Sequence, residues 1–203
     1  MSSMNATDNK RCNTKELILD AAEALLQDRG FNAFSYHHIS RQLGIKNAAI
    51  HYHFPSKADL GTALIRRYRE RFRNYTRTLE REGAGPVSKL ECYFAIPASY
   101  LQNGHKICPL GVLEAEFNAI PGSMQLETQL LDKETRDWLA RVLEEGRSLG
   151  VLRFEEPAVD KVLVLVAALQ GVLQIARVAG PQVFAVTVKQ IKRELGIFGR
   201  AVK

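Results

Sequence analysis

Residues 35–60, SYHHISRQLGIKNAAIHYHFPSKADL, decide the fold of this chain because they contain two short helical patterns separated by a glycine. Ser35 can cap a first helix in which Ile39 and Leu43 share one face, since residues four apart lie on the same side of a helix. Gly44 follows and suits a tight turn, because glycine readily adopts the left-handed conformation that ends a helix. The pattern predicts a helix over about 36–43 followed by a sharp turn.

A second helix is expected over about 48–53, with Asn47 as its cap and Ile50 and Phe54 directed inward. A third begins at Ser56, which has capping-box spacing to Asp59. The order predicts a helix-turn-helix, although a helical hairpin of no particular function has the same periodicity. The outward positions carry hydrogen-bond donors, small residues and aromatic rings without any acid, which suits a phosphate-lined groove.

Several short motifs around this stretch occur in a characteristic order. They are Ile18–Ala22, Gly30-Phe31, Ser35, Ile39, Leu43–Ile45, Ile50–Lys57 and Leu60. Through them, Thr14 to Leu60 resembles the N-terminal DNA-binding domain of the TetR family of bacterial transcriptional regulators. The resemblance covers about a quarter of the chain and implies DNA binding, but it names no ligand.

The resemblance, taken position by position, implies a set of DNA-contacting residues. The set is Ser35, His37, Lys46, Asn47, Ala48, Ala49, His51, Tyr52, His53 and Lys57. Small Ala48 and Ala49 would let the recognition helix enter the major groove, and Tyr52, His53 and Lys57 would donate to phosphates. His51 replaces the tyrosine that is usual in the family. Lys57 stands near the positive end of the dipole of the helix that begins at Ser56, and a phosphate bound there would explain this position.

Charge is distributed unevenly along the chain. The formal net charge is +6, of which +5 falls in residues 1–80 and +1 in residues 81–203. This asymmetry indicates a basic head that binds nucleic acid and a nearly neutral body. Arg66, Arg69, Arg73 and Arg77 form a basic stripe, which we interpret as a mainly solvated face that attracts DNA at long range.

The three cysteines, Cys12, Cys92 and Cys108, form no CxxC pair and have no histidine at zinc spacing. The sequence therefore predicts no disulfide framework, no metal and no cofactor, and it fits the reducing cytoplasm. The polar first residues resemble a disordered arm over 1–12 and not a signal peptide. Polar residues interrupt the most apolar segment, 158–179, so an interface helix is favoured over a membrane span.

Helix 1 is expected over about 14–29, where Asn13 and Glu16 have capping-box spacing. The helix-turn-helix domain would span 13–60, and a connecting helix would span 61–82. A glycine- and proline-rich break at 82–86 then opens a domain for ligand binding and dimerisation over 83–203. Its helices are expected at about 87–103, 109–119, 124–148, 157–179 and 182–195, and no strand pattern is found, so the protein is predicted to be all-α.

The last two long helices are apolar over a wide arc, which calls for a second surface to bury them. The resemblance implies a twofold four-helix bundle in a homodimer, and an ordinary core within one chain is the alternative. The interface residues expected are Val162, Leu165, Leu169, Val172, Phe184, Val188 and Ile191.

An effector cavity would lie among the helices of the second domain. Its candidate lining residues are Tyr93, Tyr100, Asn103, Cys108, Glu114, Phe117, Trp138 and Gln170. Cys108 stands just before Pro109 at an expected helix start, beside Lys106 and His105, where its thiol could become reactive. A buried cysteine that only fills space is the alternative. Glu114 and Glu116 are two apart on a helix and face apart, which argues against paired acid–base catalysis.

Together these features predict a homodimeric, all-α, one-component regulator that is not an enzyme. Its head would bind a palindromic operator on double-stranded DNA, and a small molecule or electrophile in the second domain would release it, as in a repressor. An activator or a co-repressed protein has the same sequence features. The alternatives from other classes are a thiol-dependent enzyme that uses Cys108 and a dimerisation module without DNA binding.

Overall fold

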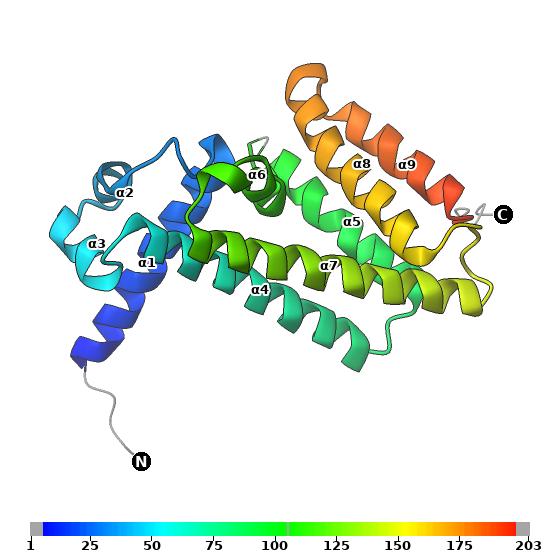
Figure 1. Cartoon of the computed structure of the whole chain (residues 1–203), viewed down its shortest axis with the longest axis horizontal. Helices are drawn as coiled ribbons and strands as arrows, with labels where there is room; N and C mark the ends of the chain where they lie inside the picture. The colour runs from blue at the N-terminus through cyan, green and yellow to red at the C-terminus, as the bar shows by residue number, and fades with distance from the viewer. Residues whose placement is uncertain (1–5, 105, 198–203) are drawn as a thin grey trace, which may run out of the picture. The chain divides into compact units, whose positions relative to one another are not determined.

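The computed structural model describes residues 6–104 and 106–197 of the 203-residue chain, with side chains from residue 14 onward. The described residues form helices and no strand, which confirms the all-α prediction (Figure 1). In chain order the helices are α1 (Ala6–Arg29), α2 (Tyr36–Leu43), α3 (Asn47–His53), α4 (Lys57–Arg81), α5 (Pro86–Gln102), α6 (Pro109–Ala115), the short 3-10 helix η1 (Phe117–Ala119), α7 (Gly122–Ser148), α8 (Ala158–Ala179) and α9 (Gln182–Glu194).

Two predicted helix starts are wrong. Helix α1 begins at Ala6, so Asn13 lies within the helix and residues 6–12 of the expected arm are helical, while residues 1–5 lie outside the described residues. Helix α3 begins one residue early, with Lys46 as the residue before it and Asn47 in its first turn. By contrast, the Ser56–Asp59 capping box is present, because each residue's backbone N–H donates to the other's side chain at 2.9 and 3.1 Å.

The described residues divide into two compact units. Unit 1 comprises Met1–Glu70 and Pro109–Leu131, and unit 2 comprises Arg71–Cys108 and Asp132–Lys203. Helices α1, α2 and α3 pack together in unit 1, and α6 packs against α1. This grouping differs from the expected boundary after residue 82, because the segment 109–131 belongs with the helix-turn-helix in unit 1.

The core of unit 1 holds the two short helices in place. Ile18 on α1, Ile39 on α2 and Ile50 on α3 are fully buried. Helices of seven or eight residues do not persist alone, so their stability comes from this packing. Gly44 ends α2 with φ of 65°, and the backbone N–H groups of Gly44 and Ile45 both donate to the Ser40 carbonyl.

Unit 2 is built around α8, which packs against α5 and α9. Six of the seven residues predicted to form the dimer interface are buried in this core within one chain, and the seventh is partly buried. They are Val162, Leu165, Leu169, Val172, Phe184 and Ile191, with Val188 as the partly buried residue. These side chains therefore pack within one chain, and an apolar arc that is wide enough for two surfaces gives no indication of which half would face a second copy.

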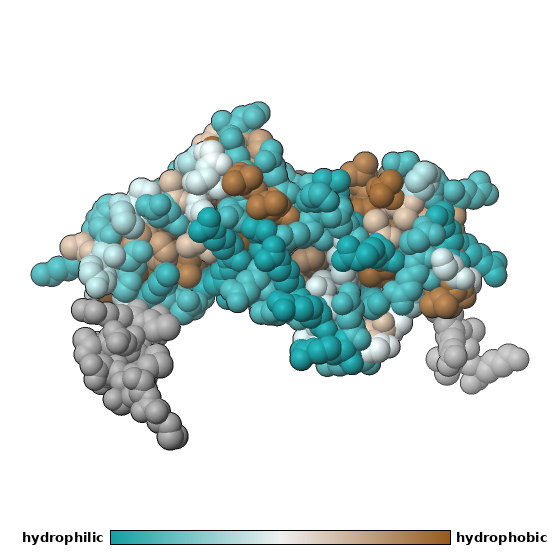
Figure 2. Space-filling model, turned by 60° about the horizontal axis from the view of Figure 1, so that its bottom comes forward, coloured by the Kyte–Doolittle hydropathy of each residue, from teal (hydrophilic) through white to brown (hydrophobic). Residues whose placement is uncertain are grey.

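Helix α8 also exposes apolar side chains, among them Val164, Ile175 and Val178. Among the described helices it is the one long and apolar enough to cross a membrane by length and composition, and 39% of its most apolar window is buried within the chain. The face of the molecule in Figure 2 is mostly hydrophilic, with apolar residues in small patches. The exposed half of α8 therefore needs a specific explanation.

Candidate nucleic-acid interface

The start of α2 is fixed by Ser35 and His38. The Ser35 backbone N–H donates to His38 Nδ1 at 3.0 Å, so Nδ1 carries no hydrogen and acts as an acceptor. Ser35 has the extended backbone expected of a residue that precedes a helix. His38 therefore serves the fold, and its Nε2–H is the donor that it can offer to solvent or to a phosphate.

Two hydrogen bonds fix the end of α3. The buried Tyr36 hydroxyl donates to the Phe54 carbonyl at 2.8 Å, and His51 Nδ1 lies 3.1 Å from the Pro55 carbonyl. A carbonyl only accepts, so Nδ1 of His51 carries the hydrogen, which leaves Nε2 as the ring atom available to DNA. Burial, with a contribution from the charge of Asp59, raises the pKa of Tyr36 to about 12. The tyrosine therefore stays neutral and keeps its hydrogen bond at physiological pH.

The predicted DNA-contacting residues form an accessible surface on α2, α3 and the adjoining loops. The exposed members are Ser35, His37, Lys46, Asn47, Ala48, His51 and Tyr52, and the partly buried members are Ala49, His53 and Lys57. Tyr52 is 66% exposed, although an aromatic side chain normally favours burial. The stretch from Arg29 to Ala58 contains no Asp or Glu, so this surface carries no carboxylate of its own.

Lys57, the predicted phosphate donor at the start of α4, is directed into the head. Its Nζ donates to the Phe31 carbonyl at 2.6 Å and lies 4.4 and 4.7 Å from the ring centres of Phe31 and Phe34. Burial lowers the pKa of Lys57, and the nearby Glu116 carboxylate partly opposes this. These contacts explain why a lysine stands at the start of α4 even when no DNA is bound. A contact between Lys57 and a phosphate stays a prediction, and it would require Lys57 to leave Phe31.

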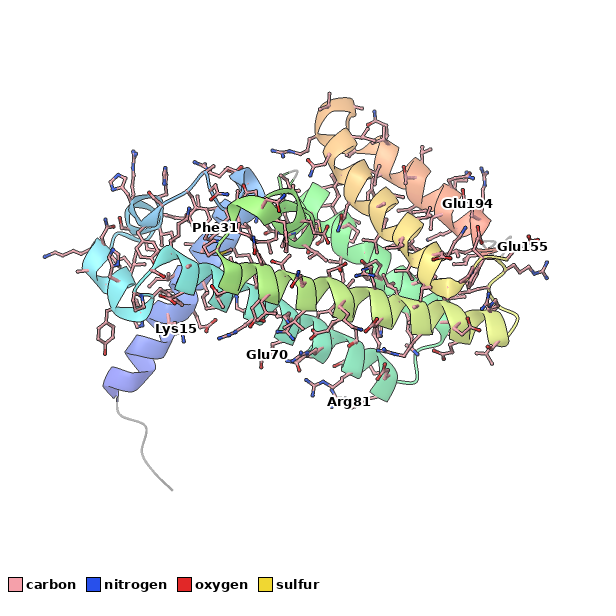
Figure 3. The ribbon with its side chains drawn as sticks, viewed as in Figure 1. Lys15, Phe31, Glu70, Arg81, Glu155 and Glu194 are labelled. Atoms are coloured by element: carbon pink, nitrogen blue, oxygen red, sulfur yellow. The ribbon has the colours of Figure 1, made fainter. Side chains whose placement is uncertain are left out.

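The loop between α1 and α2, which contains Phe31 (labelled in Figure 3), is also held by Glu116. Glu116 Oε2 accepts from the backbone N–H groups of Phe31 and Asn32 at 2.9 and 3.2 Å, and from Asn32 Nδ2 at 3.3 Å. Gly30 makes this approach possible, because its φ is 89° and a Cβ there would lie 2.3 Å from Glu116 Oε1. The Phe31 residue is thus held through its N–H by Glu116 and through its carbonyl by Lys57.

In the predicted solvated arginine stripe on α4, Arg66, Arg73 and Arg77 are exposed and Arg69 is largely buried, and three of the four form ion pairs. Arg66 Nε donates to the buried Glu127 at 2.7 Å, and Arg69 pairs with the other oxygen of the same carboxylate. In unit 2, Arg73 pairs with Glu134. These arginines are committed to carboxylates on α7, which reduces any attraction that they exert on DNA.

The residues predicted to line an effector cavity do not all lie in one unit. Glu114 and Phe117 belong to unit 1, and the other six belong to unit 2. Four of those six, Tyr93, Tyr100, Cys108 and Trp138, belong to or pack against one apolar cluster. Asn103 is exposed and Gln170 partly buried. His105, the expected partner of Cys108, lies outside the described residues.

Four residues hold the head through side-chain hydrogen bonds or ion pairs that were not predicted from the sequence: Tyr36, His38, Glu116 and Glu127. His38 stands three residues after Ser35, which is the capping-box spacing with histidine in place of the usual glutamate. That spacing could have identified it. Glu116 and Glu127 act on partners 58 to 85 residues away, and no local pattern predicts such contacts.

Known proteins match this architecture. The sequence profile of the family described as bacterial regulatory proteins, tetR family, matches residues 18–64. A TetR-family transcriptional regulator from Agrobacterium tumefaciens is 31% identical, with a TM-score of 0.83 over 90% of this chain and 98% of that one. A TetR regulator from Legionella pneumophila is 28% identical, with a TM-score of 0.80 over 96% and 100% of the two chains. The reduced form of NemR from E. coli, at 20% identity, shares the fold with a TM-score of 0.75 over 93% and 100%. Among curated proteins, none matches the chain significantly.

The helix-turn-helix in unit 1, its accessible acid-free face and these similarities define a DNA-binding transcriptional regulator. The chain belongs to the TetR family of bacterial regulatory proteins.

Proposed function

We propose that this protein is a cytoplasmic homodimeric repressor that leaves a palindromic operator when a small molecule binds unit 2. The observation that carries the DNA-binding part is the surface of α2 and α3. The stretch from Arg29 to Ala58 contains no acid, and Arg41 and Lys46 are exposed on this surface. The recognition helix presents Asn47, Ala48 and Tyr52 to solvent. Small residues allow the helix to approach the base edges, and the donors beside it suit phosphates.

The second copy is proposed to cover the exposed half of α8. Val164, Ala167, Gly171, Ile175 and Val178 are all exposed, with Val178 at 92%, and their spacing of three and four residues places them on one face. Small residues at the centre of this face let a second helix approach closely. A twofold axis there closes the assembly, and two heads then match two half-sites about 34–36 Å apart.

The signal is proposed to reach the head through the segment 109–131. This segment belongs to the compact unit of the head, and both of its ends continue directly into unit 2 along the chain. Glu116 within it holds the α1–α2 loop, and Glu127 holds Arg66 and Arg69 on α4. A ligand that changes the structure of unit 2 therefore acts on helices that share contacts with α1 and α4, and both of these helices brace the helix-turn-helix.

A thiol-dependent enzyme that uses Cys108 is the competing function. Cys108 is half-buried and packs against the apolar cluster of unit 2, directly before α6. These surroundings suit a space-filling cysteine as well as a reactive one. Turnover of an electrophilic substrate by the wild type, lost in a folded Cys108→Ala variant, would favour the enzyme.

The proposal is tested by selecting DNA from a random pool and measuring the affinity for the selected duplex by fluorescence anisotropy. A regulator that makes six to ten phosphate contacts should lose about 10³- to 10⁵-fold in affinity between about 50 and 200 mM salt. Lys46→Ala should weaken binding to all sequences and lower the salt slope by about one. Lys133→Ala, an exposed lysine of unit 2, removes the same charge and should change neither.

A selection that yields no preferred sequence would instead support the dimerisation module. Equal effects of the Lys46 and Lys133 variants would refute the phosphate contact of Lys46.

A further inference from the structure

The indole of Trp138 on α7 is an unused hydrogen-bond donor in the core of unit 2. Trp138 is 2% exposed, and its Nε1 has no hydrogen-bond partner in the described part of the chain. Buried indole N–H groups usually find an acceptor, because leaving one unpaired destabilises the folded state. An unpaired N–H in a regulator's second unit is therefore a candidate contact for a ligand.

The neighbours of Trp138 are aromatic and only partly buried. Phe72 meets the indole edge to face with ring centres 5.8 Å apart, and Tyr93 lies at 6.1 Å with its ring tilted by 46°. Phe72 and Tyr93 both retain some exposure, so the aromatic neighbours of the buried indole reach the surface of unit 2. Such rings favour a flat aromatic guest, since aromatic pairs gain energy from edge-to-face and offset packing.

A further tyrosine, Tyr75, packs against the same apolar cluster as these rings. Its hydroxyl interacts with Cys92, which packs against that cluster too. Burial, followed by the interaction with Cys92, raises the pKa of Tyr75 to about 12. Tyr75 therefore stays neutral, and it adds no charge to the cluster.

An ionic ligand in unit 2 would need a buried counter-charge that is not already paired. Among its described residues Lys89 is the buried charged side chain, and it is paired with Glu145 at 2.8 Å. A carboxylate or an ammonium group placed beside Trp138 would lose its hydration without a compensating partner. The cluster therefore favours an uncharged molecule.

We propose that unit 2 binds an uncharged aromatic molecule whose carbonyl oxygen accepts the Trp138 Nε1 hydrogen. The aromatic part packs on Phe72 and Tyr93, and the carbonyl satisfies the donor that the protein leaves unpaired. The inference rests on the proposed function and extends it, because it assigns a chemical class to the effector.

The experiment uses three probes with one ring system: 2-acetylnaphthalene, 2-ethylnaphthalene and 2-naphthoate. Calorimetry with the full chain should rank the ketone about tenfold tighter than the hydrocarbon, because it gains one buried hydrogen bond. The carboxylate should bind more weakly than both. Trp138 is the single tryptophan of the chain, so its indole N–H gives one resonance in a ¹H–¹⁵N spectrum, and only the ketone should shift that resonance downfield.

Trp138→Phe removes the donor and keeps an aromatic ring, so the ketone and the hydrocarbon should bind this variant equally. If Trp138→Phe does not fold, the indole resonance of the wild type decides alone: no downfield shift with the ketone refutes the inference. Equal affinity of the wild type for all three probes, or tighter binding of the carboxylate, also refutes it.

Operator binding is measured on the same samples. Specific operator binding with no preference among the probes would overturn the inference and leave the proposed DNA-binding function standing. Absence of specific operator binding would overturn the proposed function itself.

Discussion

Replacing Glu116 by alanine tests whether the segment 109–131 holds the α1–α2 loop. The carboxylate accepts three hydrogen bonds, of which the 2.9 Å bond from the Phe31 N–H is the shortest and is partly buried. The two bonds from Asn32 are 3.2 and 3.3 Å long and exposed. A hydrogen bond to a charged group contributes about 1.5–3 kcal/mol, and exposed ones contribute less. We therefore expect Glu116→Ala to weaken the loop by about 2 kcal/mol, and Glu116→Gln, which keeps an acceptor, to weaken it by about 1 kcal/mol.

The size of this effect determines the assay. A loss of about 2 kcal/mol changes a local opening equilibrium by about 30-fold, since 1.4 kcal/mol corresponds to a factor of ten. If the loop is closed 99% of the time in the wild type, it would still be closed for most of the time in the variant, and operator affinity would change less than twofold. Hydrogen exchange of the Phe31 and Asn32 amides reports the opening directly and should accelerate by about 30-fold.

Glu70→Ala is the matched control, because Glu70 is an exposed acid of the same unit and its removal changes the net charge equally. It should leave the exchange of both amides unchanged. The reasoning is refuted if Glu116→Ala exchanges at the wild-type rate, or if Glu70→Ala accelerates the same amides to the same extent.

Three further changes probe the head and the proposed dimer. Burial alone would raise the pKa of Glu127, but the hydrogen bonds and charges of Arg66 and Arg69 lower this pKa below 4.5. The ionised Glu127 therefore stabilises the fold above pH 4.5, and this stabilisation is lost as the pH falls through the lowered pKa. Glu127→Gln should lose about 3 kcal/mol at pH 7 and show a weaker loss of stability on acidification in urea titrations. Because the pKa of Tyr36 is raised to about 12, its neutral hydroxyl stabilises the fold fully below about pH 10, and this stabilisation is lost as the pH rises toward 12. Tyr36→Phe should therefore flatten the alkaline unfolding curve followed by circular dichroism. An unchanged curve would argue against the burial of the hydroxyl. A Cβ at Gly171 meets nothing within 4 Å in its own chain, so Gly171→Arg should preserve helicity. The same variant should convert the proposed dimer to monomer in sedimentation experiments. A dimer of unchanged affinity would exclude the exposed face of α8 as the interface.

Local patterns in the sequence predicted most of the helices. The periodicity of Ile39 and Leu43, Gly44 at the turn and the Ser56–Asp59 box are local signals, and each is present in the structure. The predicted break at 82–86 also coincides with the end of α4 at Arg81 and the start of α5 at Pro86. Such features depend on neighbouring residues alone, so sequence alone is enough to identify them.

Contacts between distant residues could not be predicted. Arg66 and Arg69 have the spacing of a solvated face, and nothing near them shows that Glu127 lies opposite. Lys57 has the sequence position of a phosphate donor, yet its cation lies over two phenylalanine rings. A lysine or an arginine fits both a solvated and a paired environment, because its long side chain can turn either way.

These pairings change where the positive charge of the head is available to DNA. Arg67 is largely buried and pairs with Glu16, Asp20 and Glu23 on α1. Together with the Glu127 pairs, this places the three arginines at 66, 67 and 69 among carboxylates. The negative charges of these acids weaken the electric field of the three arginines outside the head. At physiological ionic strength, the field that remains extends about one Debye length. The positive charges best placed to attract DNA are therefore Arg41 and Lys46, which are exposed on α2 and directly before the recognition helix α3. A charge that attracts the duplex thus also orients the head toward the groove, as specific binding requires.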